Sequence, residues 1–331
     1  MEPIPGGARS DLPRRVGSIG VYGPVADRLA PILSDLVAPG HVRACTRWDG
    51  LDEHIDEVDA LVAFKFPGRR FPRETILRGA RLRFLQLASA GVDHLGAFDP
   101  ERLTVSNASG LHGETMAEYV IAVLVHLRWN FARLHAQQRE HRWQLFEVPT
   151  LAGCTMAVIG AGHVGTTIAA RARAFGMRVV GTRRSGAPHP NVDEMFAPAD
   201  LHRALSQAEV VVLSLPLTAE TRGSIGPAEL AAVPRGGVLI NVSRGGVVDE
   251  AALLAALKAG HFSGAALDVF EREPLPPESE FWQLPNVLVT PHISSEFQDW
   301  PLAVARLFRR NVVAWVKGES LSHVVDPALG Y

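Results

Sequence analysis

The chain has 331 residues, of which 47% are hydrophobic and 21% charged, and its formal net charge is -2. This composition excludes a disordered chain, and the small net charge gives no electrostatic reason to expect nucleic acid or an anionic membrane as a partner. No apolar run approaches the roughly 20 residues of a membrane-spanning helix. The N-terminal stretch before Ser18 lacks the apolar core of an export signal, so we expect a loose tail on a cytoplasmic protein.

Cysteine usage agrees with that compartment. Only Cys45 and Cys154 are present, which is typical of a reduced cytoplasmic setting rather than a disulfide framework. Their spacing matches no metal-ligand pattern, so the sequence predicts no metal site. We expect Cys154 to have a packing role at the start of a strand.

The first third of the chain alternates short apolar runs with amphipathic ones. Predicted strands are Ser18–Val21, Val42–Ala44, Ala60–Ala63, Phe84–Leu87 and Thr104–Ser106, and predicted helices include Val25–Leu36 and Arg73–Leu77. Such alternation indicates a mostly parallel sheet. Gly113–Arg128 is apolar nearly all round and predicts a helix buried between layers or subunits. Asn130–Pro149 follows as a polar stretch that contains Trp143.

Thr155–Ser185 is the most informative segment. A strand over Met156–Ile159 and a second over Met177–Gly181 flank a helical run over Thr166–Phe175. Between the first strand and the helix, Gly160, Gly162 and Gly165 have the spacing G-x-G-x-x-G. In a dinucleotide-binding unit the first glycine makes the tight turn, the second lets the backbone approach the pyrophosphate, and the third lets the helix pack on the strand. The N–H groups at the helix start then face the phosphates.

The same alternation continues to the C-terminus. We predict strands Val210–Leu213, Gly237–Asn241, Gly264–Leu267 and Val287–Thr290, and helices Ala199–Ala208, Ala228–Ala232, Glu250–Ala259 and Leu302–Val316. The predicted fold class is therefore α/β, with two domains built on doubly wound parallel sheets. A cofactor domain over 108–299 is inserted into a first domain formed by 1–107 and 300–331.

Three segments that follow strands of the cofactor domain carry polar groups. Arg244 follows the strand ending at Asn241, Asp268 and Glu273 follow the strand ending at Leu267, and His292 follows the last strand. Residues just past the carboxyl ends of parallel strands line the ligand site of an open sheet, so these side chains can meet at the nicotinamide end of a dinucleotide.

With these motifs in order around the glycine turn, the sequence resembles the D-2-hydroxyacid dehydrogenases from Leu87-Ala-Ser-Ala-Gly-Val-Asp-His to its last residues. The resemblance implies a flavodoxin-like substrate-binding domain, a Rossmann cofactor domain and a homodimer. It places the catalytic residues at Arg244, Glu273 and His292. It also implies that Asp268 positions the nicotinamide carboxamide, and that Ser89 and the N–H groups of Ala90 and Gly91 bind the substrate carboxylate.

These roles make chemical sense for reduction of a 2-keto acid, which needs a hydride at carbon and a proton at oxygen. An imidazole titrates near neutral pH, so His292 suits the proton transfer. A nearby carboxylate favours the charged imidazolium, so Glu273 should stabilise and orient it. Arg244 can bind the substrate carboxylate and polarise the keto oxygen.

The strand after the glycine turn suggests which dinucleotide is bound. NAD sites place an acid about 20 residues past the turn, for the ribose 2′-OH. Here Arg183, Arg184 and Ser185 follow the strand, no acid occurs before Asp193, and Arg183 stands where the family's NAD-type members carry aspartate. Guanidinium groups favour a 2′-phosphate, so NADP(H) is predicted as the preferred cofactor, with NAD(H) as the alternative. The other predicted cofactor contacts are the turn residues Gly160, Gly162, His163, Val164 and Gly165, together with Pro216 and Asp268.

Several assignments stay open. Lys65 is a candidate for binding a substrate anion, although a solvated lysine is the simpler interpretation, and His94 and His112 are the other histidines near the predicted site. Ser295, Phe297 and Trp300 belong to a segment, Ser294–Trp300, that either closes the pocket with aromatics, favours an apolar substrate or packs an interface. The alternatives to a small 2-keto acid reductase are a phosphite-type dehydrogenase and a dinucleotide-sensing corepressor-like scaffold. Glu273 argues against a formate dehydrogenase, whose histidine partner is glutamine.

Overall fold

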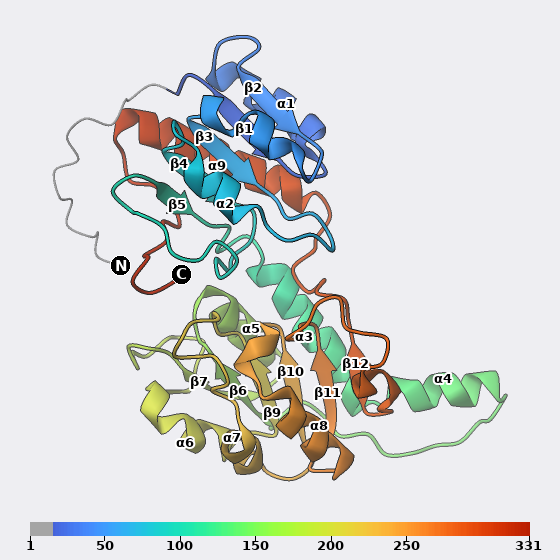
Figure 1. Ribbon diagram of the computed structural model, residues 1–331. Coiled ribbons are helices and arrows are strands. Elements are labelled where there is room, and N and C mark those ends of the chain that lie inside the picture. Colours follow the sequence, from blue (N-terminus) through green and yellow to red (C-terminus); the bar gives the residue numbers. More distant parts are fainter. Residues whose placement is uncertain (1–15) are drawn as a thin grey trace. The chain divides into compact units, whose positions relative to one another are not determined.

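The computed structural model describes residues 16–331 and divides the chain into two compact units (Figure 1). One unit contains the chain up to Ser109 together with Asp299–Tyr331, and the other contains Gly110–Gln298. The predicted N-terminal tail lies outside the described residues.

The first unit is built on a five-stranded parallel sheet with the order β2-β1-β3-β4-β5. Its strands are β1 (Ile19–Tyr22), β2 (Val42–Cys45), β3 (Ala60–Ala63), β4 (Phe84–Leu87) and β5 (Thr104–Ser106). This order is that of flavodoxin-like folds. All residues of β1, β3 and β4 are buried, as expected for parallel strands covered on both faces.

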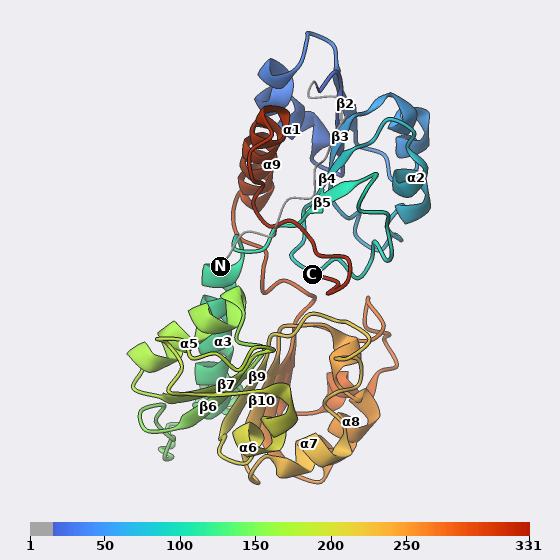
Figure 2. The same ribbon diagram turned by 90° about the vertical axis from the view of Figure 1, so that its left-hand side faces the viewer.

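Helices cover both faces of that sheet (Figure 2). They are α1 (Ala26–Leu33), α2 (Arg73–Arg78) and α9 (Trp300–Lys317). Alternate residues of β4 point to opposite faces: Phe84 stacks on Phe308 of α9 with ring centroids 5.8 Å apart, whereas Leu85 joins the core that includes Ile76 of α2. The C-terminal helix is therefore an integral layer of the first unit.

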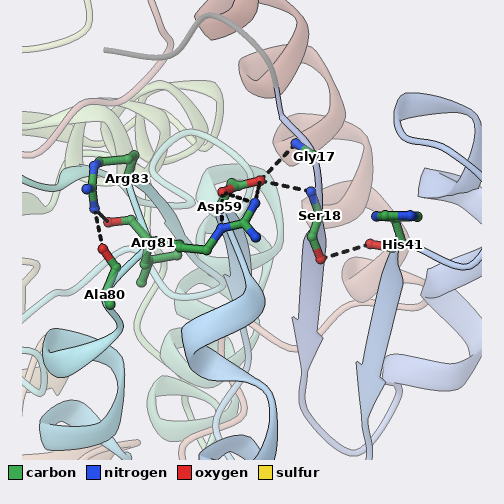
Figure 3. A network of polar contacts seen from close by, with 8 residues as sticks. Gly17, Ser18, His41, Asp59, Ala80, Arg81 and Arg83 are labelled. Atoms are coloured by element: carbon green, nitrogen blue, oxygen red, sulfur yellow. Dashed lines mark hydrogen bonds and ion pairs between the residues drawn. The ribbon is translucent and has the colours of Figure 1, made fainter. Parts of the chain in front are cut away.

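The amino ends of β1 and β3 are joined by the carboxylate of Asp59 (Figure 3). Its Oδ2 accepts the N–H groups of Gly17 and Ser18 at 2.8 and 2.9 Å, and Arg81 donates to both of its oxygens at 3.1 Å. This cluster lies at the edge opposite to the carboxyl ends of the strands. It anchors the entry of the chain into the sheet and is a structural feature.

The second unit is built on a seven-stranded parallel sheet with the order β12-β11-β10-β9-β6-β7-β8. Its strands are β6 (Thr155–Ile159), β7 (Arg178–Thr182), β8 (Glu194–Phe196), β9 (Val210–Leu213), β10 (Gly237–Asn241), β11 (Phe262–Leu267) and β12 (Val287–Val289). The order reverses between β6 and β9, which is the switch point where a Rossmann sheet binds its dinucleotide. The predicted α/β class with two doubly wound parallel sheets is confirmed.

Two layers of helices enclose this sheet (Figure 2). The enclosing helices are α3 (Gly113–Arg128), α5 (His163–Ala174), α6 (Leu201–Leu205), α7 (Pro227–Ala232) and α8 (Glu250–Lys258), whereas α4 (Phe131–Arg139) belongs to neither layer. One core joins α3 and α5 to one face of the strands, and a second core joins α6, α7 and α8 to the other face. The helix predicted over 113–128 has the predicted bounds, but Glu114, Glu118 and Ala122 are exposed, so it is buried along part of its surface only.

Other predicted elements differ from the structure. The helix predicted to begin at Thr166 begins at His163, because its first turn is formed by the glycine motif itself. The helix predicted over 199–208 is a 3₁₀ turn, Pro198–Asp200, followed by the short α6. No helix within residues 16–331 is long and apolar enough to cross a membrane.

Two elements were not predicted. The edge strand β8 has a single fully buried residue, Phe196, so it shows no apolar run. Helix α4 lies in the stretch predicted to be polar and irregular, and Gln137 is its only buried residue. Both lack the apolar periodicity that reveals buried elements. Asn130, whose side chain accepts the N–H of Arg133 at 3.1 Å, is the capping signal that marks the start of α4.

Candidate active site

The three glycines after β6 occupy three different environments. Gly160 has φ +101°, and a Cβ there would lie 2.7 Å from the carbonyl oxygen of Ser214. A Cβ on Gly165 would lie 2.3 Å from the oxygen of Gly160, so only glycine lets α5 pack this closely on the turn. Gly162 has nothing within 4 Å of its Cβ position. The turn is therefore closed on its protein side and open where a ligand would approach.

This geometry fits the pyrophosphate of a dinucleotide. Gly162 is the N-cap of α5, and the first residues of that helix are His163 and Val164. The first N–H groups of a helix have no intrahelical acceptor, and the positive end of the helix dipole favours an anion. The loop after β9 borders the same turn: Ser214 Oγ donates to the oxygen of Gly160 at 3.0 Å, and Thr221 Oγ1 donates to the oxygen of Pro216 at 2.6 Å.

Cationic side chains follow β7, where an adenosine ribose lies in Rossmann folds. Arg183 is partly buried, and its guanidinium has no hydrogen-bond or ion-pair partner among residues 16–331. Arg184 forms an ion pair with Glu220 at 3.4 Å, with both side chains well exposed. Ser185 accepts the N–H of Ala187 at 3.3 Å. Of the two guanidinium groups, that of Arg183 is therefore the one open to a new anion.

The nearest acid along the chain serves another purpose. Asp193 accepts the N–H of Val179 at 2.8 Å and pairs with Arg173, so it lies beside the amino end of β7. Arg183 follows the carboxyl end of the same strand, roughly 13 Å away at the usual rise per residue. Asp193 cannot substitute for the ribose-binding acid of an NAD site.

Arg244 is held by the loop that follows β10. The side chain of Asn241 accepts the N–H of Ser243 at 3.0 Å and its hydroxyl at 2.7 Å, which turns the chain sharply at the end of the strand. Arg244 then lies partly buried in extended conformation, and its Nη1 donates to the oxygen of Ser243 at 2.8 Å. Its charge contributes to lowering the pKa of Glu273.

Gly245 fixes where this loop lies relative to the loop after β11. A Cβ on Gly245 would lie 1.9 Å from the carbonyl carbon of Phe270 and 2.1 Å from the nitrogen of Glu271. The two backbones are therefore in direct contact. Any side chain at this position would separate the Arg244 loop from the loop that carries Glu273.

Glu273 and His292 form a hydrogen-bonded pair. His292 Nδ1 lies 2.8 Å from Glu273 Oε2, and Phe270 N–H donates to Oε1 at 3.1 Å. Burial acts to raise the pKa of Glu273, but the hydrogen bond and charge of His292, the Phe270 N–H and Arg244 together lower it. Because the ionised carboxylate can only accept, Nδ1 carries a proton, and Nε2 is the ring nitrogen left for other partners.

The backbone of His292 is held in a conformation unusual for a residue with a side chain, with φ +56°. The carbonyl oxygen of Asp268 accepts the His292 N–H at 2.9 Å. The Asp268 carboxylate, which is buried, accepts the hydroxyl of Thr290 at 2.6 Å and the N–H groups of Ile293 and Ser294 at 2.9 and 3.0 Å. Asp268 therefore holds the His292 loop on both sides of the imidazole.

Tyr119 of α3 completes this network. Its hydroxyl lies 2.7 Å from Thr290 Oγ1, which already donates its proton to Asp268, so the Tyr119 hydroxyl is the donor. Burial raises the pKa of Tyr119 to about 12, which keeps the donor proton in place at neutral pH. Sequence reasoning missed four residues that hold these loops: Tyr119, Thr290, Gly245 and Glu250, the last of which accepts the N–H of Glu271 at 2.6 Å. For Gly245 and Glu250, the available signal was their place in the motif Arg244-Gly-Gly-Val-Val-Asp-Glu.

In the first unit, the loop after β4 presents two N–H groups on one side. The oxygen of Ser89 accepts the N–H of Ala108 at 3.0 Å, and the oxygen of Ala90 accepts the side chain of Asn107 at 2.8 Å. In a trans peptide the N–H points opposite to the C=O, so the N–H groups of Ala90 and Gly91 face away from those anchors. Neither has an acceptor among residues 16–331.

The remaining candidates lie within one unit or the other. Lys65 is exposed after β3, and His94 packs edge-on against Phe71 at 4.5 Å between ring centroids, in the first unit. Trp300, also in the first unit, packs against Phe64 at 5.4 Å. In the second unit His112 is buried, its Nδ1 lies 3.1 Å from the oxygen of Ser295, and its ring is 6.0 Å from that of Phe297. Within residues 16–331 no cluster of three His, Cys, Asp or Glu side chains suits a metal ion.

A Rossmann sheet with an open glycine turn, beside loops carrying a carboxylate-bound imidazole and an arginine, defines a nicotinamide-dinucleotide dehydrogenase. Comparison with known proteins specifies the family. Residues 121–294 match the model of the D-isomer specific 2-hydroxyacid dehydrogenase NAD-binding domain. A glyoxylate reductase of Thermococcus litoralis is 31% identical over 83% of this chain and 85% of its own.

Further similarities span more than three quarters of the chain. A glyoxylate/hydroxypyruvate reductase A of Salmonella paratyphi B is 34% identical over 78% of this chain and 85% of its own. A Xanthobacter autotrophicus 2-hydroxyacid dehydrogenase solved with NADPH and MES is 35% identical, with TM-score 0.83 over 96% of this chain and 100% of its own. An NADPH-dependent glyoxylate/hydroxypyruvate reductase from Sinorhizobium meliloti, solved with NADP and sulfate, is 30% identical, with TM-score 0.82 over 95% of this chain and 100% of its own. The chain belongs to the D-isomer-specific 2-hydroxyacid dehydrogenase family.

Proposed function

We propose that this enzyme reduces a small 2-keto acid to the D-2-hydroxy acid with NADPH, in the manner of glyoxylate and hydroxypyruvate reductases. The observation that carries the proposal is the 2.8 Å bond between His292 and the ionised Glu273, with Arg244 acting electrostatically on the same carboxylate. These groups supply a proton and bind an anion, which are the two requirements of keto-acid reduction besides the hydride. The names of the relatives favour the same substrate class.

The imidazole of His292 gives a proton to the keto oxygen from Nε2. Glu273 holds the Nδ1 proton, fixes the orientation of the ring and stabilises the imidazolium before transfer. The hydrogen bonds of Asp268 keep the ring from moving with its loop. Glu273 holds the ring and Asp268 holds the backbone on either side of it, so the imidazole is oriented before substrate binds. This orientation reduces the entropy that is lost on reaching the reactive geometry.

Arg244 stabilises the negative charge that develops on the keto oxygen and binds the substrate carboxylate. The nicotinamide ring supplies the hydride when the dinucleotide is bound. For the first unit we propose that the N–H groups of Ala90 and Gly91 donate to the substrate carboxylate. Their shared direction, and the lack of another acceptor for either within residues 16–331, support that role.

The preference for NADPH rests on Arg183. A partly buried guanidinium beside the end of β7, with no partner among the described residues 16–331, suits a 2′-phosphate. The first acid along the chain, Asp193, is occupied at the other end of that strand. The relatives from Xanthobacter autotrophicus and Sinorhizobium meliloti were solved with NADPH and NADP, which favours the same choice.

Replacing Arg183 with aspartate should raise the Michaelis constant for NADPH by about 10- to 100-fold, since a charge-assisted contact with the phosphate is lost and a repulsion is added. The constant for NADH should stay the same or fall. The measurement is steady-state kinetics with each cofactor, with Arg235→Asp as the control because Arg235 is exposed on a loop after α7. Unchanged constants for both cofactors would place Arg183 outside the binding site.

The proposed activity is tested by following the absorbance of the reduced nicotinamide. NADPH and NADH are compared with glyoxylate, hydroxypyruvate, pyruvate, phenylpyruvate and longer branched 2-keto acids. We expect NADPH oxidation with at least one small 2-keto acid. Binding of NADPH without turnover of any of them would contradict the proposal, and activity with phosphite and an oxidised cofactor would replace it by the phosphite-type alternative.

We also propose the homodimer that the family resemblance implies. Trp143 and Leu145, in the segment after α4, are 96% and 87% exposed, and α4 projects from the sheet of its unit (Figure 1). Large apolar side chains so exposed are typical of interaction sites. Light scattering of the purified protein distinguishes the mass of a dimer from that of a monomer, and a monomeric mass at micromolar concentration would contradict the proposal.

A further inference from the structure

The segment between Arg244 and α8 touches the Glu273 loop at two places. At its beginning, the backbone of Gly245 lies directly on the peptide between Phe270 and Glu271. At its end, Glu250 Oε1 accepts the N–H of Glu271 at 2.6 Å. Both ends of the short segment that follows Arg244 therefore contact the chain immediately before Glu273.

Glu250 is well placed to hold that loop still. It is the first residue of α8, where the helix dipole favours a carboxylate, and Asp249 caps the same helix by accepting the N–H of Ala252 at 2.9 Å. Leu253 and Leu257 bury the helix against the sheet. The hydrogen bond from Glu271 therefore ends on a rigid element.

The charges around Glu250 are mostly negative. Glu271 and Glu273 face it from the loop, and Asp249 adjoins it on α8. Burial, and then these two facing carboxylates, raise the pKa of Glu250, which the N–H of Glu271 opposes. No Lys, Arg or His among residues 16–331 forms an ion pair with it. A half-buried acid held beside other acids costs stability, and such groups concentrate at functional sites.

We propose that Glu250 is a positioning residue for the catalytic pair, which holds the Glu273 loop through Glu271 and adds a second negative charge behind Glu273. The inference rests on the proposed function of Glu273 and His292. The bond to Glu271 sets where Glu273 meets the imidazole. The charge of Glu250 adds to the negative charge of Glu273 beside the imidazole.

Two substitutions separate these contributions. Glu250→Gln keeps an acceptor for the Glu271 N–H but removes the charge, whereas Glu250→Ala removes both. The matched control is Glu229→Gln, since Glu229 also lies in the first turn of a helix, α7, and accepts a backbone N–H, that of Gly226, at 3.1 Å. The control should leave activity and its pH dependence unchanged.

For Glu250→Gln we expect the alkaline limb of kcat/KM for reduction to move to lower pH, because a negative charge beside the catalytic pair is removed. The maximal rate should stay within about threefold of wild type. For Glu250→Ala the maximal rate should also fall about tenfold or more, because the position of Glu273 relaxes. The NMR titration of the His292 imidazole should move in the same direction in both variants, and this readout does not depend on turnover.

The melting temperature checks that the effects are local. The raised pKa of Glu250 means that its ionised form costs stability once the pH rises above the ordinary glutamate range. Glu250→Gln should therefore melt no lower than wild type near neutral pH. An unshifted His292 titration in both variants would overturn the inference, whatever their melting temperatures. Absence of wild-type turnover, with the titration shifted, would instead contradict the proposed function alone.

Discussion

Replacing His292 with alanine should lower kcat for 2-keto acid reduction by about 10²–10⁴-fold, the usual contribution of a positioned general acid. Of the three residues proposed for catalysis, only His292 can give a proton. Glu273 is ionised and its two oxygens accept from His292 and Phe270, and arginine does not release protons at working pH. The Michaelis constant for NADPH should change little, because the pyrophosphate and ribose contacts are predicted on other loops. Stopped-flow single turnover measures the chemical step directly.

A matched control exists within the same unit. His202 Nε2 lies 2.9 Å from Glu229 Oε1, so it too is a histidine bound to a glutamate, but it lies on α6 and is well exposed. His202→Ala should keep full activity. If His292→Ala kept activity within about threefold of wild type, the assignment of His292 as the acid would be wrong.

Replacing Arg244 with alanine should lower kcat/KM by about 10²–10³-fold, the usual cost of removing one donor from a developing oxyanion. Both kcat and the Michaelis constant for the 2-keto acid should be affected, because the same guanidinium is proposed to bind the substrate carboxylate and to stabilise the transition state. Arg244→Lys should recover only part of the loss, since an ammonium keeps the charge but not the fork of donors. The hydrogen bond between Glu273 and His292 should also be perturbed, because Arg244 helps to keep the Glu273 carboxylate ionised.

Two measurements separate catalysis from folding in this variant. The melting temperature should stay near that of wild type, because the backbone contact that Gly245 makes between the two loops is kept in this variant. Added guanidinium ion should partly restore turnover in Arg244→Ala if the lost group acted on the substrate. Wild-type kcat/KM in Arg244→Ala, or a loss explained entirely by unfolding, would contradict the role proposed for this residue.

The sequence by itself was sufficient for the fold class. Parallel strands covered on both faces are largely apolar along their length, so β3 and β9 stand out as uninterrupted apolar runs. Glycine spacing identified the dinucleotide unit, because the turn requires glycine for stereochemical reasons that act locally. The same logic failed at β8 and α4, because each has a single buried residue and therefore no apolar run.

The tertiary structure decided which side chains meet. Glu273 and His292 lie on different loops, and the bond between their side chains exists because β11 and β12 pair in parallel and end at the same edge. Gly245 and Glu250 gain their importance from a loop more than twenty residues further along the chain, which no local pattern indicates. Asp268 likewise holds the His292 loop through three hydrogen bonds that arise only after both strands are paired. Backbone conformation and strand burial depend on near neighbours and can be inferred from sequence, whereas contacts between loops depend on the register of the sheet.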